Sequence, residues 1–188
     1  MFGCLKQDVM RYTRSRDGKR YPLPIAAIRL INPGLLAIIL HRYVYSINRL
    51  CQGDNRKMLR RLLKASYHIG RKIVMAWGKI HISEATEFGP GLYLSGKGGI
   101  IIGSRSIGRN FTAEHNVTIG MGINNETPII GDNVVVRHDS VIYGDIKVGS
   151  GSVIDAESVL SKTIPEKSLV KGNPARIIKR PIEFQDYV

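Results

Sequence analysis

The stretch Ile130–Leu160, IGDNVVVRHDSVIYGDIKVGSGSVIDAESVL, carries a branched aliphatic residue at every sixth position. These residues are Ile130, Val136, Ile142, Val148, Ile154 and Leu160. An α-helix repeats every 3.6 residues and a strand every second residue, so neither explains the spacing. A period of six predicts a solenoid in which each hexapeptide forms one short strand and one corner.

The same period runs outward from this stretch, from Ile82 to about Pro165, and is interrupted at Met121–Pro128, where we expect a projecting loop. A second apolar or small residue follows four places on, as at Phe111, Val117 and Ser140. Three hexapeptides make one coil, which predicts the inward groups Ile82/Phe88/Leu94, Ile101/Ile107/Ala113, Ile119/Ile130/Val136 and Ile142/Val148/Ile154. Leu94, Ala113, Val136 and Ile154 should therefore share one face.

Residues 1–78 have a different pattern and form a basic, largely helical N-terminal region. Arg42–Leu50 and Arg56–Trp77 carry apolar residues three and four apart, which predicts amphipathic helices. Asn32-Pro33-Gly34 reads as a turn or helix start, and Gly53-Asp54-Asn55 as a loop. These helices either dock on an anionic membrane surface or form an oligomerising cap with a solvated basic face. The mainly β domain then spans 79–165, and a C-terminal tail covers 166–188.

The chain is strongly basic, with 28 Lys and Arg against 15 Asp and Glu and a formal net charge of +13. No helix-turn-helix, zinc finger or aromatic-studded sheet is visible, so we expect no nucleic-acid partner. An anionic cofactor, a phosphate-bearing substrate or the inner membrane surface explains the charge more simply. Two cysteines without metal-ligand spacing predict no disulfide framework, no metal site and a cytoplasmic protein.

Four motifs resemble the serine acetyltransferase branch of the hexapeptide acyltransferases, in particular the members found in polysaccharide biosynthesis. They are Gly89-Pro90-Gly91-Leu92-Tyr93, Val117-Thr118-Ile119-Gly120, Ile130-Gly131-Asp132-Asn133 and Gly172-Asn173-Pro174-Ala175-Arg176. The resemblance implies a left-handed parallel β-helix, a homotrimer, and acetyl-CoA bound in a groove between neighbouring subunits. It also implies acetyl transfer to a hydroxyl with a histidine as general base.

The catalytic pattern of that family is missing here. The position of its histidine falls on Gly96, or on Ser95 if the match slips by one residue. The position of its orienting aspartate falls on His81, and that of its loop histidine on about Thr127. Restored or raised activity after placing a histidine at position 96 would show that the original site still has its geometry.

Two other histidines lie in the column that contains this vacant position. Two residues beyond each inward residue of the shared face come Gly96, His115, His138 and Ala156. His115 is the leading candidate for the base, with Glu114 beside it to orient or polarise the ring, and His138 is the second candidate. The plain alternative is that both belong to ladders of stacked polar residues that only stabilise the solenoid.

The resemblance also places the acyl donor. Ala156 and Ser158 should line the pantetheine groove, and Lys171, Arg176 and Lys179 should meet the CoA phosphates. Bulky Arg137 and His138 stand where relatives have small residues, and they would narrow that groove.

The sequence therefore predicts an acetyl-CoA-dependent O-acetyltransferase acting on a hydroxyl of a sugar or lipid-linked glycan in surface-polysaccharide biosynthesis. Serine O-acetylation is one alternative. A hexapeptide-fold protein that only binds or assembles partners is the other.

Overall fold

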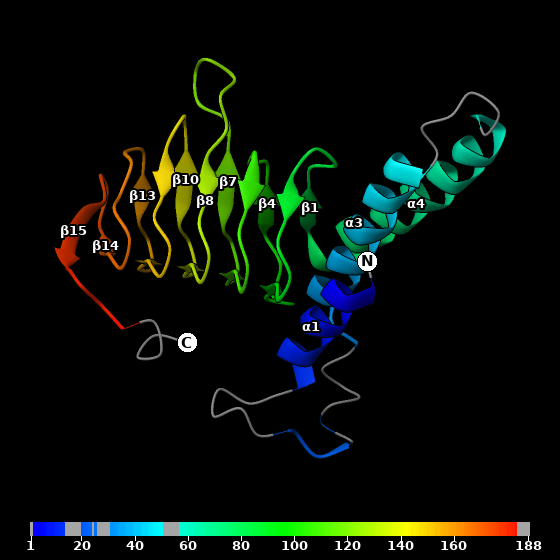
Figure 1. Ribbon diagram of the computed structural model, residues 1–188, viewed down its shortest axis with the longest axis horizontal. Coiled ribbons are helices and arrows are strands. Elements are labelled where there is room, and N and C mark those ends of the chain that lie inside the picture. Colours follow the sequence, from blue (N-terminus) through cyan, green and yellow to red (C-terminus); the bar gives the residue numbers. More distant parts are fainter. Residues whose placement is uncertain (1, 14–19, 24, 26–30, 51–56, 184–188) are drawn as a thin grey trace.

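The computed structural model describes residues 2–13, 20–23, 25, 31–50 and 57–183. It shows a parallel β-helix with helices at its N-terminal end (Figure 1). The helices are α1 (Phe2–Thr13), α3 (Pro33–Leu50) and α4 (Lys57–Gly78). The parallel β-helix and the helical N-terminal region predicted from the sequence are confirmed. The predicted loop Gly53–Asn55 lies outside the described residues.

Three sheets form the walls of the solenoid, and most strands pair in parallel with the strand three elements further along the chain. The first sheet contains β1 (Ile80–Ile82), β4 (Ile100–Ile102), β7 (Thr118–Gly120), β10 (Val141–Tyr143) and β13 (Val159–Leu160). The second contains β2 (Glu87–Phe88), β5 (Ser106–Ile107), β8 (Ile129–Ile130) and β11 (Lys147–Val148). The third contains β3 (Tyr93–Leu94), β6 (Thr112–Ala113), β9 (Val135–Val136), β12 (Val153–Ile154), β14 (Leu169–Lys171) and the antiparallel β15 (Arg176–Lys179).

The solenoid core follows the period of six with one correction. Ile107, Ala113, Ile119, Val136 and Ile154 are buried as predicted. Ile101, however, is 47% exposed, and the inward residue of β4 is Ile102, which pairs with Ile82 and Ile119. The cause is the corner after β3, because eight residues separate Leu94 from Ile102 instead of six.

The helices close the N-terminal end of the solenoid, where strands β1, β2 and β3 each have one unpaired edge. The buried Tyr12 hydroxyl donates to the Leu94 carbonyl and accepts from the Leu94 N–H, both at 2.9 Å. The fully buried Asp8 carboxylate accepts from the N–H groups of Gly91 and Leu92, both at 2.8 Å. These side chains supply the hydrogen bonds that a neighbouring coil would otherwise provide.

Arg42 of α3 connects the two helices to this edge. Its Nε donates to Asp8 at 3.2 Å, and its terminal nitrogens donate to the carbonyls of Phe88 and Gly89 at 2.8 and 2.5 Å. The buried carboxylate of Asp8 is thus paired with a charge and hydrogen-bonded, as a buried ion requires.

The outer faces of the sheets differ in what covers them. On the third sheet, Tyr12 of α1 packs at a tilt against Tyr93, with ring centroids 4.8 Å apart, and Ile182 packs with the buried Val135 and Val153. The first sheet carries outward-facing Ile101, Thr118, Val141 and Val159 in one register column, without such a cover among the described residues. The first sheet is therefore the open apolar wall of the solenoid.

Residues 121–128 form the predicted loop between β7 and β8, and the loop projects from the solenoid (Figure 1). Met121 and Ile123 are exposed on it. Among the helices that the structure describes, no one is long and apolar enough to cross a lipid bilayer.

Removing the Tyr12 hydroxyl should destabilise the fold. Tyr12→Phe leaves the N–H and carbonyl of Leu94 buried without partners, so we expect it to lower the free energy of unfolding by about 1–3 kcal/mol. Tyr143→Phe alters a tyrosine that is 40% exposed and serves as the matched control, with an expected change within about 0.5 kcal/mol. Equal midpoints for both variants in urea denaturation would show that the edge cap contributes nothing.

Candidate active site at the corner after the third sheet

The register of the third sheet brings the predicted column together. Leu94 pairs with Ala113, Ala113 with Val136, and Val136 with Ile154. The corner that follows these strands, before the chain enters the first sheet, therefore carries Gly96, His115, His138 and Ala156 on successive coils. The predicted alignment of these positions is confirmed.

The two histidines of this corner form a stacked pair. The imidazole centroids of His115 and His138 lie 5.1 Å apart with an interplanar angle of 11°. That distance is close to the spacing of neighbouring strands, roughly 4.8 Å, as expected for equivalent positions one coil apart. Both side chains are only partly buried.

His138 has a carboxylate partner that the sequence reasoning did not assign. Its Nδ1 lies 2.9 Å from Oδ2 of Asp139, whose other oxygen accepts from the Asn116 amide at 2.5 Å. The hydrogen bonds from Asn116 and His138 lower the pKa of Asp139, so the carboxyl is ionised near neutral pH. An ionised carboxylate only accepts, so Nδ1 of neutral His138 carries the proton and Nε2 keeps its lone pair.

Glu114 contacts the same corner through the backbone. Its carboxylate accepts from the N–H of His138 at 3.1 Å. This contact fixes the backbone that carries His138, whereas the prediction had placed Glu114 at the ring of His115. The carboxylate that orients an imidazole in this corner is Asp139.

A charge ladder runs beside the histidines on the third sheet. Asp155 pairs with Arg137 at 3.6 Å and with Lys171 at 3.0 Å. Burial works to raise the pKa of Asp155, but the hydrogen bonds from Lys171 and from the Ala156 N–H outweigh it and lower the pKa. A polar ladder of the kind predicted as the plain alternative therefore exists, in the column next to the one that carries the imidazoles.

The corner also gathers three groups able to ligate a metal ion. One ligand atom each from His115, His138 and Asp139 lies within 4.8 Å of the others. Two imidazoles and a carboxylate are ligands that zinc accepts. Local spacing in the sequence gave no sign of this group because its members come from successive coils, and the absence of a metal site stays a prediction.

The vacant family position is filled from the N-terminal region. A Cβ atom at Gly96 would lie 2.7 Å from Nδ2 of Asn32, well inside contact distance. Asn32 precedes Pro33, the first residue of α3, and its Oδ1 accepts from the Gly34 N–H at 2.7 Å. Asn32 is thus the N-cap of α3 and is held in place. A side chain at position 96 would therefore have to displace Asn32.

The predicted donor residues lie further along the same corner and at the C-terminal end. Ala156 is partly buried beyond His138, and Arg176 and Lys179 are exposed on β15. Lys171 is exposed but already paired with Asp155. Ser158 is fully buried, and its hydroxyl contacts the Ala156 carbonyl and the Gly172 N–H. The hydroxyl of Ser158 is therefore used within the solenoid, and its place in the pantetheine groove stays a prediction.

Residues 127–162 match the family described as bacterial transferase hexapeptide (six repeats). Serine acetyltransferase 2 of Arabidopsis thaliana is 33% identical over 147 residues, covering 76% of this chain and 43% of that protein. The chain thus spans less than half the length of this relative.

Solved structures agree in fold over nearly the whole chain. Serine acetyltransferase from Brucella abortus strain S19, in complex with coenzyme A, has a TM-score of 0.72 and 27% identity, covering 94% of this chain and 67% of that one. Soybean serine acetyltransferase complexed with serine has a TM-score of 0.73 and 26% identity, covering 94% and 68%. Residues 127–162 thus match the hexapeptide-repeat transferases, and the relatives that the chain resembles are serine acetyltransferases.

The contact between Asn32 and Gly96 predicts a coupled pair of substitutions. Gly96→Ala should displace the N-cap and lower the free energy of unfolding by about 1–2 kcal/mol. Asn32→Gly removes the obstructing amide and alone costs only about a few tenths of a kcal/mol. The double variant should therefore be more stable than Gly96→Ala. Additive losses in a double-mutant cycle of urea unfolding would show that the two residues do not compete for space.

Proposed function

We propose that this chain is an acetyl-CoA-dependent O-acetyltransferase whose general base is His138. The observation that carries the proposal is the Nδ1–Oδ2 contact of 2.9 Å between His138 and Asp139. It leaves the Nε2 lone pair of a partly exposed imidazole free to take a proton. Support comes from the match of residues 127–162 to the hexapeptide-repeat transferases and from the coenzyme A that the Brucella relative binds.

The reaction balances around this imidazole. Nε2 of His138 removes the proton of the acceptor hydroxyl as its oxygen attacks the thioester carbonyl carbon of acetyl-CoA. The tetrahedral intermediate collapses with cleavage of the carbon–sulfur bond, and the departing thiolate of CoA takes the proton from the imidazolium. Asp139 acts as a positioning residue because it holds the tautomer of His138 and stabilises the transient imidazolium. His115 packs on the ring from the preceding coil.

The acyl donor fits along the same corner toward the C-terminal end. Ala156 follows His138 in the column and presents a small side chain, while Arg176 and Lys179 lie exposed beyond it. The pantetheine arm of CoA would run past Ala156, and the phosphates of CoA would lie beside Arg176 and Lys179. Lys171, which pairs with Asp155, would add a third positive charge near the phosphates.

The acceptor best supported is serine. The relatives are serine acetyltransferases, and the soybean structure holds serine. They offer no support for the sugar or glycan hydroxyl predicted from the sequence. A homotrimer, as the resemblance implies, would bury the open apolar wall of the first sheet around Ile101, which is 47% exposed. Burial of such a wall between copies is favourable through the hydrophobic effect.

Separate assays with different acceptors test which hydroxyl compound is acetylated. Purified chain with acetyl-CoA and L-serine should release free CoA and form O-acetylserine, detected by mass spectrometry. Replacing serine by common hexoses and N-acetylhexosamines should reduce CoA release to the hydrolysis background. Turnover of a sugar but not of serine would restore the glycan acceptor, and CoA binding without any turnover would favour a non-catalytic binding protein.

Substitution of the two histidines separates their roles. His138→Asn should lower kcat by about 10²- to 10⁴-fold, the usual contribution of a positioned base. His115→Asn should lower kcat clearly less, and Glu114→Gln should mainly lower the free energy of unfolding. Asp139→Asn should lower kcat with little change in KM and alter the tautomer of His138 seen by ¹⁵N NMR. The reverse ranking, with His115→Asn the severe variant, would return the role of base to His115.

Loss of two cations should weaken donor binding. Arg176→Ala together with Lys179→Ala should raise the Kd for CoA by about 5- to 150-fold, equivalent to about 1–3 kcal/mol of charged hydrogen bonds. Lys147→Ala with Lys162→Ala removes the same charge from exposed positions elsewhere and is the matched control. Calorimetry at fixed salt checks both, and equal losses would mean that only net charge matters.

A further inference from the structure

Helix α4 presents two apolar faces, of which only one is packed against the protein. Tyr67 and Val74 are buried on the inner face, 3% and 2% exposed. Gly70 lies between them in the chain, and a Cβ atom there would meet the side chain of Leu40 at 2.8 Å, so α3 and α4 approach closely. This inner face accounts for the packing of the hairpin.

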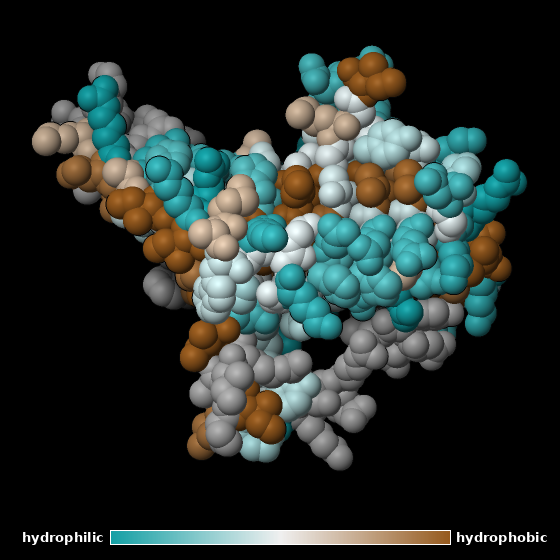
Figure 2. Space-filling model, turned by 180° about the vertical axis from the view of Figure 1, so that it is seen from behind, coloured by the Kyte–Doolittle hydropathy of each residue, from teal (hydrophilic) through white to brown (hydrophobic). Residues whose placement is uncertain are grey.

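The outer face carries a row of large apolar side chains, which we call the apolar stripe. Its residues and exposed fractions are Met58 77%, Leu62 62%, Ile69 64%, Ile73 54% and Trp77 54%. Spacings of four and seven residues place them on one side of a helix. Figure 2 shows brown side chains gathered along one edge of the helical projection, beside teal ones. A contiguous exposed row of this kind marks an interaction surface.

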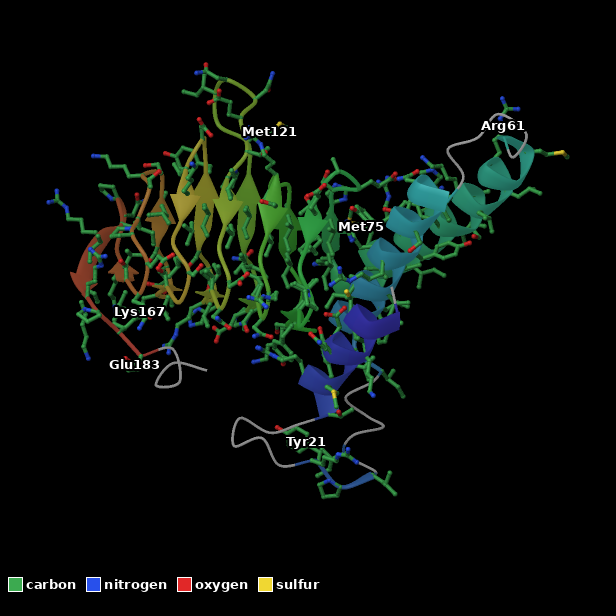
Figure 3. The ribbon with its side chains drawn as sticks, viewed as in Figure 1. Tyr21, Arg61, Met75, Met121, Lys167 and Glu183 are labelled. Carbon is green, nitrogen blue, oxygen red and sulfur yellow. The ribbon has the colours of Figure 1, made fainter. Side chains whose placement is uncertain are left out.

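Basic side chains flank the apolar stripe, and α4 contains no acidic residue. Exposed Arg61 and Lys72 lie about 100° around the helix from its centre, with Lys64 and Arg71 further round. Figure 3 shows Arg61 near the free end of the projection and Met75 close to the solenoid, so Arg61 lies at the end of α4 that is far from the solenoid. Lys64 also faces Glu84 of the solenoid at 3.9 Å.

We propose that the apolar stripe docks on the surface of an anionic phospholipid bilayer. Large apolar side chains beside basic ones on one helix give simultaneous contact with acyl chains and with acidic head groups. Trp77 suits the boundary between the two because its ring is apolar and its N–H is polar. The hairpin of α3 and α4 projects from the end of the solenoid, which lets α4 lie along a flat surface (Figure 1).

Charge favours a bilayer over a second copy of the chain. Pairing two apolar stripes would bring the basic rows of two helices together, and α4 offers no carboxylate to compensate them. Like charges brought close in this way are destabilising. The docking needs none of the residues proposed for acetyl transfer, so the two proposals stand or fall separately.

Trp77 is the only tryptophan of the chain and reports directly on the surface. Adding vesicles of phosphatidylcholine with about 30% phosphatidylglycerol should shift its emission to shorter wavelength and protect it from aqueous quenchers. Vesicles of phosphatidylcholine alone should do neither. The full chain should also sediment with the anionic vesicles only. Unchanged emission together with no co-sedimentation overturns the proposal.

Because the whole chain is basic, the decisive variants keep the charge. Ile69→Ser with Ile73→Ser should weaken binding to the anionic vesicles by about tenfold or more, since exposed positions lose apolar area without loss of core packing. Ile123→Ser, on the projecting loop, is the matched control and should bind like the parent. Undiminished binding of the Ile69/Ile73 variant would reduce the effect to net charge and refute the apolar stripe. A smaller assembly of that variant in light scattering without lipid would show that a second copy covers the stripe instead, and this result also contradicts the proposal.

Discussion

The open backbone edge of the first coil determines how the rest of the chain is arranged. Every later coil obtains its hydrogen bonds from the coil before it, but β1, β2 and β3 have no predecessor. The carboxylate of Asp8, the hydroxyl of Tyr12 and the guanidinium of Arg42 take that place. Because Asp8 and Arg42 pair with each other and all three side chains hydrogen-bond to the solenoid backbone, the helices are fixed to the solenoid by directed contacts and not only by apolar packing.

This attachment reaches the candidate site. Asn32 caps the N-terminus of α3, and its side chain packs against Gly96. Gly96 lies one coil before His115. The side chain of Asn32 therefore fills the space in which the resemblance places the usual catalytic histidine. A base in this chain has to come from a later coil, and the stacked pair of His115 and His138 is the pair of imidazoles that the corner offers among the described residues.

The period of six predicted the walls, the buried rows and the alignment of Gly96, His115, His138 and Ala156, because stacking in a solenoid follows directly from spacing. It failed at Ile101, where three consecutive isoleucines, Ile100 to Ile102, gave no alternation to choose the inward residue. Asn32 was read as part of a turn or helix start, and Asn-Pro at a helix start is an N-cap signal, but its contact with Gly96 depends on the packing of α3. The partnership of Asp139 with His138 depends on side-chain conformation, which spacing does not encode.

Asp155 and Asp139 lie in neighbouring columns of one corner, and they have different roles because they contact different side chains. Asp155 is held between Arg137 and Lys171, so its charge is consumed within the solenoid. Asp139 stands at a corner residue with a positive φ of 59°, and its carboxylate is directed at Asn116 and at the imidazole beside it. Stacked coils thus place a structural ladder and the proposed catalytic pair one residue apart.

The position of the cap in the chain bears on how the protein is made. Asp8, Tyr12 and Arg42 precede the first strand, so they leave the ribosome before the coil that they cover. The contact of Tyr12 with Leu94 spans 82 residues and is among the long-range closures of the fold, whereas successive strands pair over about one coil. Once that closure forms, each new coil meets a ready template and adds in order toward the C-terminus. The order of these elements in the chain thus allows the solenoid to assemble during synthesis from an end that is already capped.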